Sequence, residues 1–421
     1  MLNVSDEIKN LYAQDSLIKY ITINVYKNRA GYKSGSKVAT ITNKDIISES
    51  MVLTESVCEA ENLELGNITS SQFEIDITNS VMSNITGNYI EALIKIEGNE
   101  YNLPLFHGTV ETAKISDNRL TRHIVAHDDV YNILDTDITA WYKNYWKKYP
   151  NQNTIKKLRE NILKYFGIDF ETQTLPNDDM VFIVNTYVAN NEITARKLLK
   201  NICEINGCFG IINRNNRFEF RILNDIELIY PSNAIYPQAT LYPGWSLVNG
   251  TNYFEVNSFI STYYGEYKTL KINKLNIYGI NDNGKEYLIG TIDEGEVYPR
   301  TMIYPNQPTQ NGNSIYPGLI TDKFNQYEIR DNILFDSISA EFSQLNMYQI
   351  YNAIKGNDYT PVDYLKIKGV PFVEVGDVIN INDGNIDISF PLLSRTLTGI
   401  QSLTDDFSAK GEEYINKEQY I

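Results

Sequence analysis

Histidines and adjacent acids are the residues of this sequence whose types and spacing could support chemistry. His123 and His127 are four residues apart, a spacing that lets two imidazoles hold one zinc ion on a helix. The surrounding segment alternates apolar and polar residues, which predicts a strand, and four residues of a strand span ~13 Å. We therefore expect no metal site there. We expect His107, beside a glycine in another strand, to be packed or hydrogen-bonded.

Two pairs of adjacent acids, Asp128-Asp129 and Asp405-Asp406, are the candidates for a general acid and base. Neighbours on a strand point to opposite faces, and both pairs sit at segment ends, where aspartate commonly caps or turns. Neither pair therefore predicts a dyad, although carboxylates from separate strands could still form a glycosidase site. The sequence has no nucleophile elbow, Walker loop, His-Glu-x-x-His motif or Cys-His pairing. It predicts no enzyme, no metal site and no cofactor.

Composition and charge exclude further classes of protein. The 421 residues predict two to four domains, and 53 acidic against 37 basic residues give a net charge of -16. We find no basic stripe or Lys/Arg run, so we expect no sequence-specific nucleic-acid binding. No apolar run approaches the ~20 residues of a membrane span. The polar N-terminus predicts no signal peptide, and Cys58, Cys203 and Cys208 are expected to be buried thiols of a chain made in the cytosol.

Hydrophobic periodicity predicts a mainly β chain with an α+β insert. Residues 72–78 alternate cleanly between apolar and polar side chains, as a half-buried strand does. Residues 153–168 and 191–208 carry apolar side chains at helical spacing and reach Gly167 and Gly207, which are typical helix terminators. A short helix after Ser5 buries too little by itself, so we expect it to dock on a partner or neighbour.

These patterns divide the chain into six segments, with two β-barrel-like domains flanking a small α+β domain. The expected segments are an N-terminal arm (1–19), a first β-barrel domain (20–130), an α+β domain (131–228), a linker (229–244), a second β-barrel domain (245–411) with a helix inserted at about 336–356, and a mobile tail (412–421).

A Tyr-Pro repeat is the one internal repeat. An aliphatic residue, tyrosine and proline recur every six residues from position 229, and again from position 297 at spacings of six and twelve. Because a residue before proline is pushed towards extended geometry, these stretches predict surface connectors. They are either linkers packed on their own domain or a belt that grips a neighbouring subunit. The tyrosines of this possible interface belt are Tyr230, Tyr236, Tyr242, Tyr298, Tyr304 and Tyr316.

Several stretches resemble the baseplate-hub family of phage tails, also called the tail-associated or minor tail proteins of siphophages and related prophages. They include residues 49–77, 105–142 (LFHGTVETAK), 192–223 (ITARKLLKNICEINGCFG) and 368–411 (GVPFVEVGDV and LTGIQSLTDDFSAKG). The positions that carry these motifs are Phe106, Gly108, Asp128, Trp141, Gly207, Gly369, Pro371, Gly376, Asp377, Gly399, Asp405 and Asp406.

The resemblance implies a structural virion protein and a fold with two similar β-barrel domains. Three copies would form a ring that closes the tail tube at the phage tail tip, after assembly in the bacterial host cytoplasm. The implied partners are the chain itself as a homotrimer, the distal tail protein, the tail tube protein, the tape measure protein and a receptor-binding or spike protein, with DNA passing on ejection. Many relatives continue into a hydrolase or fibre. This sequence ends about ten residues past its last motif, so we expect those parts on separate subunits.

Two other classes remain compatible with the sequence. One is a carbohydrate-binding or glycan-degrading tail protein, for which Trp141, Trp146 and the many tyrosines could stack sugars. The other is the hub of a contractile injection particle or bacteriocin, through which no DNA passes.

Overall fold

The protein is described here by a computed structural model of the whole chain. The residues that the structure describes are 1–14, 16–58, 63–79, 84–149, 153–181, 192–223, 253–269, 271–280, 284–293, 309–310, 313–314, 326–335, 344–356, 358–382 and 386–411. The expected linker, the six Tyr-Pro tyrosines and the expected mobile tail lie outside these ranges.

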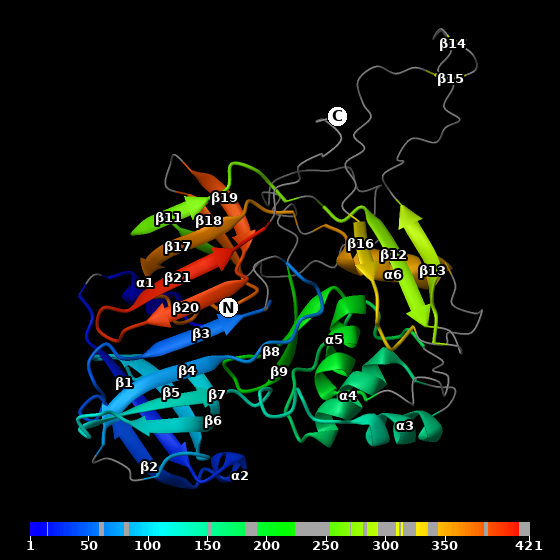
Figure 1. Cartoon of the computed structure of the whole chain (residues 1–421). Coiled ribbons are helices and arrows are strands. Elements are labelled where there is room, and N and C mark those ends of the chain that lie inside the picture. Colours follow the sequence, from blue (N-terminus) through cyan, green and yellow to red (C-terminus); the bar gives the residue numbers. More distant parts are fainter. Residues whose placement is uncertain are drawn as a thin grey trace.

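One sheet of eleven strands forms the backbone of the fold and contains strands from both ends of the sequence (Figure 1). Its strands, in spatial order, are β11 (Ser261–Tyr264), β17 (Val362–Lys368), β21 (Thr404–Ala409), β20 (Ser394–Thr398), β3 (Val52–Ser56), β4 (Gln72–Thr78), β7 (Thr121–His127), β6 (Leu103–Ile115), β5 (Tyr89–Ile96), β1 (Lys19–Tyr26) and β2 (Lys37–Thr42).

The antiparallel pairing of β3 with β20 joins the two halves of this sheet. Its register runs from Ser394 opposite Ser56 to Thr398 opposite Val52, and the strands are more than 300 positions apart in the chain. The mainly β prediction is confirmed. Strand pairing among the described residues does not close either half into a barrel, because β2 and β11 end an open ladder.

Smaller sheets and helices lie beside the large sheet, with α3, α4 and α5 on its lower right in Figure 1. The small sheets are β10 (Tyr253–Val256), β18 (Val378–Asn382) and β19 (Asp387–Pro391); β13 (Glu286–Asp293), β12 (Lys274–Ile280) and β16 (Gln326–Ile329); β8 (Cys208–Ile212) and β9 (Phe218–Ile222); and β14 (Thr309–Gln310) and β15 (Asn313–Ser314). The helices are α1 (Asp6–Ala13), α2 (Arg29–Lys33), α3 (Thr139–Lys148), α4 (Ile155–Tyr165), α5 (Ala195–Ile205) and α6 (Gln344–Ile354).

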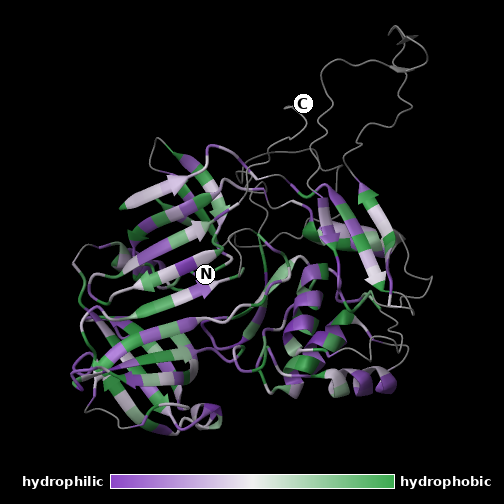
Figure 2. Cartoon of the chain, in the orientation of Figure 1, coloured by the Kyte–Doolittle hydropathy of each residue, from purple (hydrophilic) through white to green (hydrophobic). Residues whose placement is uncertain are grey.

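Side-chain alternation explains how the strands form a core. In β4, Phe73, Ile75 and Ile77 are fully buried while the residues between them reach the surface. The alternating colours of the strands in Figure 2 show the same period of two along much of the sheet. A strand with this alternation contributes one apolar face to the packed side and one polar face to solvent.

The two predicted helices are α4 and α5, and local sequence defines both of their ends. Thr154 and Thr194 cap them, each accepting a hydrogen bond from a backbone N–H three residues later. Gly167 and Gly207 follow the last turns with positive φ angles of 66° and 61°, as the terminator prediction requires. No helix in the described part of the chain is long and apolar enough to span a membrane.

The N-terminal helix α1 forms where Ser5 caps it, and of the two expected docking surfaces, a partner or a neighbouring element, the structure shows the neighbouring element. Ile8 and Tyr12 of α1 are buried in the chain's own core. The Tyr12 ring packs edge-on against Phe372, with centroids 6.1 Å apart. The short helix gains enough buried area from the C-terminal half of the same molecule.

Gly207 and Gly167 give a matched test of close packing at a helix end. A Cβ at Gly207 would overlap the carbonyl of Ala353 in α6, whereas a Cβ at Gly167 meets nothing within 4 Å. Both alanine variants bear the left-handed backbone strain of about 1–2 kcal/mol. We expect Gly207→Ala to lower the free energy of unfolding by a further 1–3 kcal/mol, roughly, because α6 must shift. Denaturant titrations followed by circular dichroism measure the free energy of unfolding of both variants. An equal loss for Gly207→Ala and Gly167→Ala would contradict the role of the contact with α6.

Candidate functional site

The most distinctive site is a cluster of buried charges, which we call the ionic junction, where three parts of the chain meet. Arg395 of β20 and Asp405 of β21 are fully buried at its centre. Arg395 Nε donates to Asp405 Oδ1 at 2.7 Å and Nη2 donates to Oδ2 at 3.0 Å, so the pair is bidentate. Arg395 also donates to the carbonyls of Val370 and Val373, and Val370 N–H donates to Asp405 Oδ2 at 2.7 Å.

The N-terminal half of the sheet enters the junction through Glu55 of β3. Glu55 Oε2 lies 3.6 Å from Arg395 Nη1 and accepts a hydrogen bond from Arg214 Nη2. Arg214 belongs to the turn between β8 and β9, and its other terminal nitrogen donates to the Leu105 carbonyl of β6. One arginine from the α+β part therefore contacts the N-terminal half directly, and a shared carboxylate links it to the C-terminal half.

A second set of charges extends the junction along β9. Arg221 Nη1 lies 3.3 Å from Asp377 Oδ1, and its Nη2 lies 3.5 Å from Glu374 Oε2. Glu374 Oε1 accepts a hydrogen bond from the Arg214 N–H at 3.1 Å, and Asp377 Oδ2 accepts one from the Glu374 N–H at 2.8 Å. Gly376 has a φ of 84°, and a Cβ there would overlap the Arg221 side chain. A glycine is thus required where the arginine crosses the loop.

Burial and charge act in opposite directions on the pKa values of these groups. Burial alone would raise the pKa of Glu374, but attraction to Arg221, the α-amino group and Arg214 lowers it to about 2. Burial raises the pKa of Glu55, and Arg214 and Arg395 only partly offset the rise. Burial opposes the charged form of Arg395, yet the neighbouring Asp405 raises its pKa. The cluster therefore holds mutually neutralising ions.

Among the residues that the structure describes, the junction leaves no space in which a substrate could reach these charges. The cavity lined by Glu55, His107, Asp128 and Arg214 has a volume of about 10 Å³, room for roughly one water molecule. Asp128 accepts hydrogen bonds from Ser70 Oγ and Ser71 N–H at 2.8 and 2.7 Å, and burial raises its pKa to about 7. The arrangement can hold chain segments together, and its groups are already committed to one another.

The paired acids behave as strand geometry predicts, with one correction. Asp405 points inward to Arg395, and Asp406 points outward to Lys366 at 3.5 Å. The expectation that this pair sits at a segment end is wrong, because both residues lie within β21. Asp129 turns away from Asp128 and pairs with Arg29 at 2.8 Å. Neither pair forms a dyad.

The histidines lie on strands, as predicted. His123 Nδ1 is 2.8 Å from Asp76 Oδ1, and its Nε2 is 3.2 Å from Glu74 Oε2. His127 Nε2 is 3.1 Å from Glu111 Oε2. No group of three potential metal ligands occurs among the residues that the structure describes.

Many of the motif positions come together around the ionic junction. The loop that contains Gly369, Pro371, Gly376 and Asp377 surrounds Arg395 and Arg221 through its carbonyls and carboxylates. Phe106 and Asp128 line the small cavity beside Arg214, and a Cβ at Gly108 would overlap the His127 carbonyl. Four motif positions lie outside this group. Gly207 packs against α6, and Gly399 lies beside the Glu49 carboxylate. Asp406 points to the outer face of β21, and Trp141 lies in α3.

Trp141 lies in an aromatic group at the helices. Its ring stacks on Tyr145 with centroids 5.3 Å apart and tilts against Tyr165 at 5.8 Å. Tyr145 is buried, so the stacked face of Trp141 is occupied by the protein itself. This packing role gives no specific support to sugar stacking at Trp141.

Sequence reasoning missed the arginines at the centre of the junction. The sequence held a signal for two of these charges, because residues two apart on a strand point to the same face. Arg395 is two residues from the buried Leu397, and Glu55 is two residues from the buried Leu53, so each charge lies on the apolar face of its strand. Arg214 gave no such signal, because a turn residue normally faces solvent.

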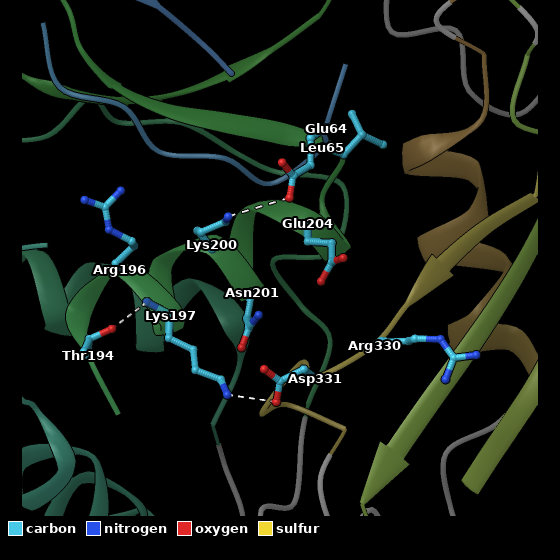
Figure 3. Close-up of a pocket in the computed structure, with 10 residues that line it drawn as sticks. All are labelled: Glu64, Leu65, Thr194, Arg196, Lys197, Lys200, Asn201, Glu204, Arg330 and Asp331. Atoms are coloured by element: carbon cyan, nitrogen blue, oxygen red, sulfur yellow. Dashed lines mark hydrogen bonds and ion pairs between the residues drawn. The ribbon is translucent and has the colours of Figure 1, made fainter. Parts of the chain in front are cut away.

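The structure also shows a wider pocket, of about 380 Å³, between α5 and the segment after β16 (Figure 3). Ion pairs cross its sides, from Lys197 to Asp331 at 2.9 Å and from Lys200 to Glu64 at 3.8 Å. Glu204 lies deeper, and burial raises its pKa to about 7. Its carboxylate accepts hydrogen bonds from Asn332 and Tyr327, so the pocket offers no uncommitted catalytic group among the described residues.

Solved structures resemble this chain, whereas comparisons of its sequence found no match. No family profile matches the sequence, and no curated protein matches it. A 43 kDa tail protein of prophage MuSo2 from Shewanella oneidensis is 11% identical, with a TM-score of 0.48 over 93% of this chain and 98% of that one. A tail protein from Neisseria meningitidis MC58 is 10% identical, with a TM-score of 0.47 over 94% and 97% of the two chains. The prophage tail protein gp18 from Listeria monocytogenes EGD-e is 11% identical, with a TM-score of 0.43 over 93% and 95%.

Asp405 and its neighbour Asp406 provide a test of the ionic junction. Asp405→Asn leaves the buried Arg395 guanidinium without its counter-ion, and we expect a loss of about 3–5 kcal/mol in the free energy of unfolding. Asp406→Asn, on the outer face of the same strand, should cost at most about 1 kcal/mol. Urea titrations at neutral pH measure both. Similar losses for the two variants would show that the buried pair is not the stabilising one.

The depressed pKa of Glu374 predicts a specific dependence of stability on pH. Because the folded carboxyl has a pKa of about 2 against 4.5 for a glutamate in the unfolded chain, its contribution is fully present above about pH 4.5. It is lost as pH falls towards 2. Glu374→Gln should therefore be less stable than wild type near pH 7, by roughly 3 kcal/mol at most, and the gap should close between about pH 4.5 and 2. A gap that is constant with pH would refute the assignment.

Proposed function

We propose that this chain is a structural subunit of a phage tail, a hub that closes the end of the tail tube at its tip. The observation that carries the proposal is the ionic junction, which binds segments from three parts of the chain into one rigid unit. Its charges neutralise one another and leave no room for substrate. The motifs that resemble the baseplate-hub family cluster around this junction, so the resemblance and the geometry concern the same residues.

We expect this rigid protein to function by assembling, with three copies forming a ring. The partners we propose are the distal tail protein, the tail tube protein, the tape measure protein and a receptor-binding or spike protein. Three copies carry three times the net charge of -16, and acidic walls would repel DNA phosphates during ejection. The proposal includes no catalytic activity of the chain itself.

The two ends of the large sheet are the strand edges that assembly would cover. Among the described strands, β2 and β11 each pair on one side only. Val38 of β2 and Tyr263 of β11 are 54% and 61% exposed, so each unpaired edge presents a large side chain to solvent. We propose that these edges meet other tail subunits or other copies.

Mass photometry of the purified protein tests this proposal. A trimer has a mass of about 145 kDa, three times 48.3 kDa. Val38→Lys and Tyr263→Lys should each lower the trimer fraction, because lysine on an edge blocks strand pairing. Leu120→Lys, at a residue 69% exposed in the turn between β6 and β7, is the matched control and should leave the trimer intact.

The opposing outcomes separate the alternatives. A protein that remains a monomer alone and in mixtures with the proposed tail partners contradicts the hub function. Binding or cleavage of a glycan, abolished by a single substitution, would favour the carbohydrate-active class. Flanking genes that encode a tail without a capsid would favour the injection-particle class.

A further inference from the structure

The charge of this protein is separated in space, and the helices carry the positive part. Between Thr139 and Phe166 the sequence has seven basic residues and one acid, Glu160, a local charge of +6. The rest of the chain therefore carries -16 minus 6, or -22. The linear sequence showed no basic run because these residues are dispersed over two helices and their connection.

Folding brings these residues together. Contact between the Trp141 and Tyr165 rings places α3 against α4. Arg159 is buried and pairs with Asp178, so it does not contribute to the surface. The remaining six lysines form what we call the lysine face: Lys143, Lys147, Lys148, Lys156, Lys157 and Lys164.

The lysine face is suited to an acidic protein surface and poorly suited to a membrane. A membrane-surface helix directs its apolar side chains outward into the lipid. In α3, Tyr142 and Tyr145 are 2% and 6% exposed, so these aromatic side chains face the protein core. Lysines on long, adaptable stems predominate among the exposed side chains of α3 and α4, beside Tyr165, which is 56% exposed, and Lys164, which pairs with Glu160 at 3.3 Å.

An acidic surface of the required kind exists on the same chain. Glu74 and Asp76 lie on the solvent side of β4, and Glu111 lies on β6; β7 pairs with both strands, and we call the three acids the carboxylate face. Their ionic contacts in the described part of the chain are with His123 and His127. Lys114, opposite His123, is the basic residue of these strands that shares this side. In Figure 1 these strands lie on the left and the helices α3 and α4 on the right.

We propose that the lysine face of one copy docks on the carboxylate face of a second copy of this chain. The two faces are different surfaces of one molecule, so the contact is head-to-tail and leads to a ring when the rotation between copies closes. This inference rests on the proposed hub function and names the surfaces through which the copies meet. It also determines how each copy is oriented towards its neighbour in the ring, because two faces of the same charge repel each other.

Charge reversal at the start of α4 tests the docking without harming the helix. Lys156→Glu with Lys157→Glu places acids in the first turn, where the helix dipole favours them. We expect this double variant to associate about tenfold more weakly than wild type, or worse, in sedimentation velocity or mass photometry. Lys285→Glu with Lys355→Glu changes two exposed lysines by the same charge, away from both faces and from the edge strands β2 and β11, and should associate normally.

A charge swap makes the test specific for the two faces. Adding Glu74→Lys and Asp76→Lys to the Lys156→Glu and Lys157→Glu chain rebuilds the opposite charges with reversed sign and should restore association. Wild-type association should weaken between about 0.05 and 0.5 M sodium chloride, since exposed charges are screened. Circular dichroism confirms that each variant is folded.

Each other outcome overturns part of the interpretation. If wild type assembles and the Lys156→Glu, Lys157→Glu variant assembles equally well, the proposed contact between the lysine face and the carboxylate face is wrong. The proposed hub function then stands. If wild type never assembles alone or with the proposed tail partners, both are wrong. If the lysine variant loses binding to short duplex DNA or to anionic phosphatidylserine vesicles while its assembly is unchanged, the lysine face serves that ligand instead.

Discussion

The buried pair of Arg395 and Asp405 is the constraint on which the rest of the structure depends. Both side chains have no solvent exposure, so every charge and donor must find a partner inside the protein. Arg395 satisfies its remaining donors with the carbonyls of Val370 and Val373, which determines the path of that loop. Glu55 then provides a second acid beside Arg395, which places β3 next to β20.

The same requirement extends to the α+β part of the molecule. Glu55 raises the negative charge at the centre, and Arg214 from the turn between β8 and β9 compensates it. Arg221, on β9, neutralises Glu374 and Asp377 in the loop that surrounds Arg395. No one of the three parts can be removed without leaving an uncompensated buried charge, a cost of several kcal/mol. A cluster of this kind holds the three parts in one fixed arrangement.

Surface charges are distributed differently from the buried charges of the ionic junction. In the junction, the charged groups pair with groups of the same chain. Outside, Lys156, Lys157 and their neighbours gather on α3 and α4, while the rest of the chain has an excess of acids. An uneven surface of this kind gives a molecule a preferred orientation towards its own copies, because complementary faces attract and like faces repel.

The sequence by itself determined the local elements, because period and end signals act over a few residues. It predicted the strand character around Phe73, the ends of α4 and α5, and the opposite directions of Asp405 and Asp406. It did not predict that β3 pairs with β20, or that Arg214 reaches Glu55. Those contacts join residues far apart in the chain, and the low-dielectric interior that makes them strong exists only after the chain has folded. The tertiary structure alone therefore decided which charges are buried in the ionic junction and which lie on the surface.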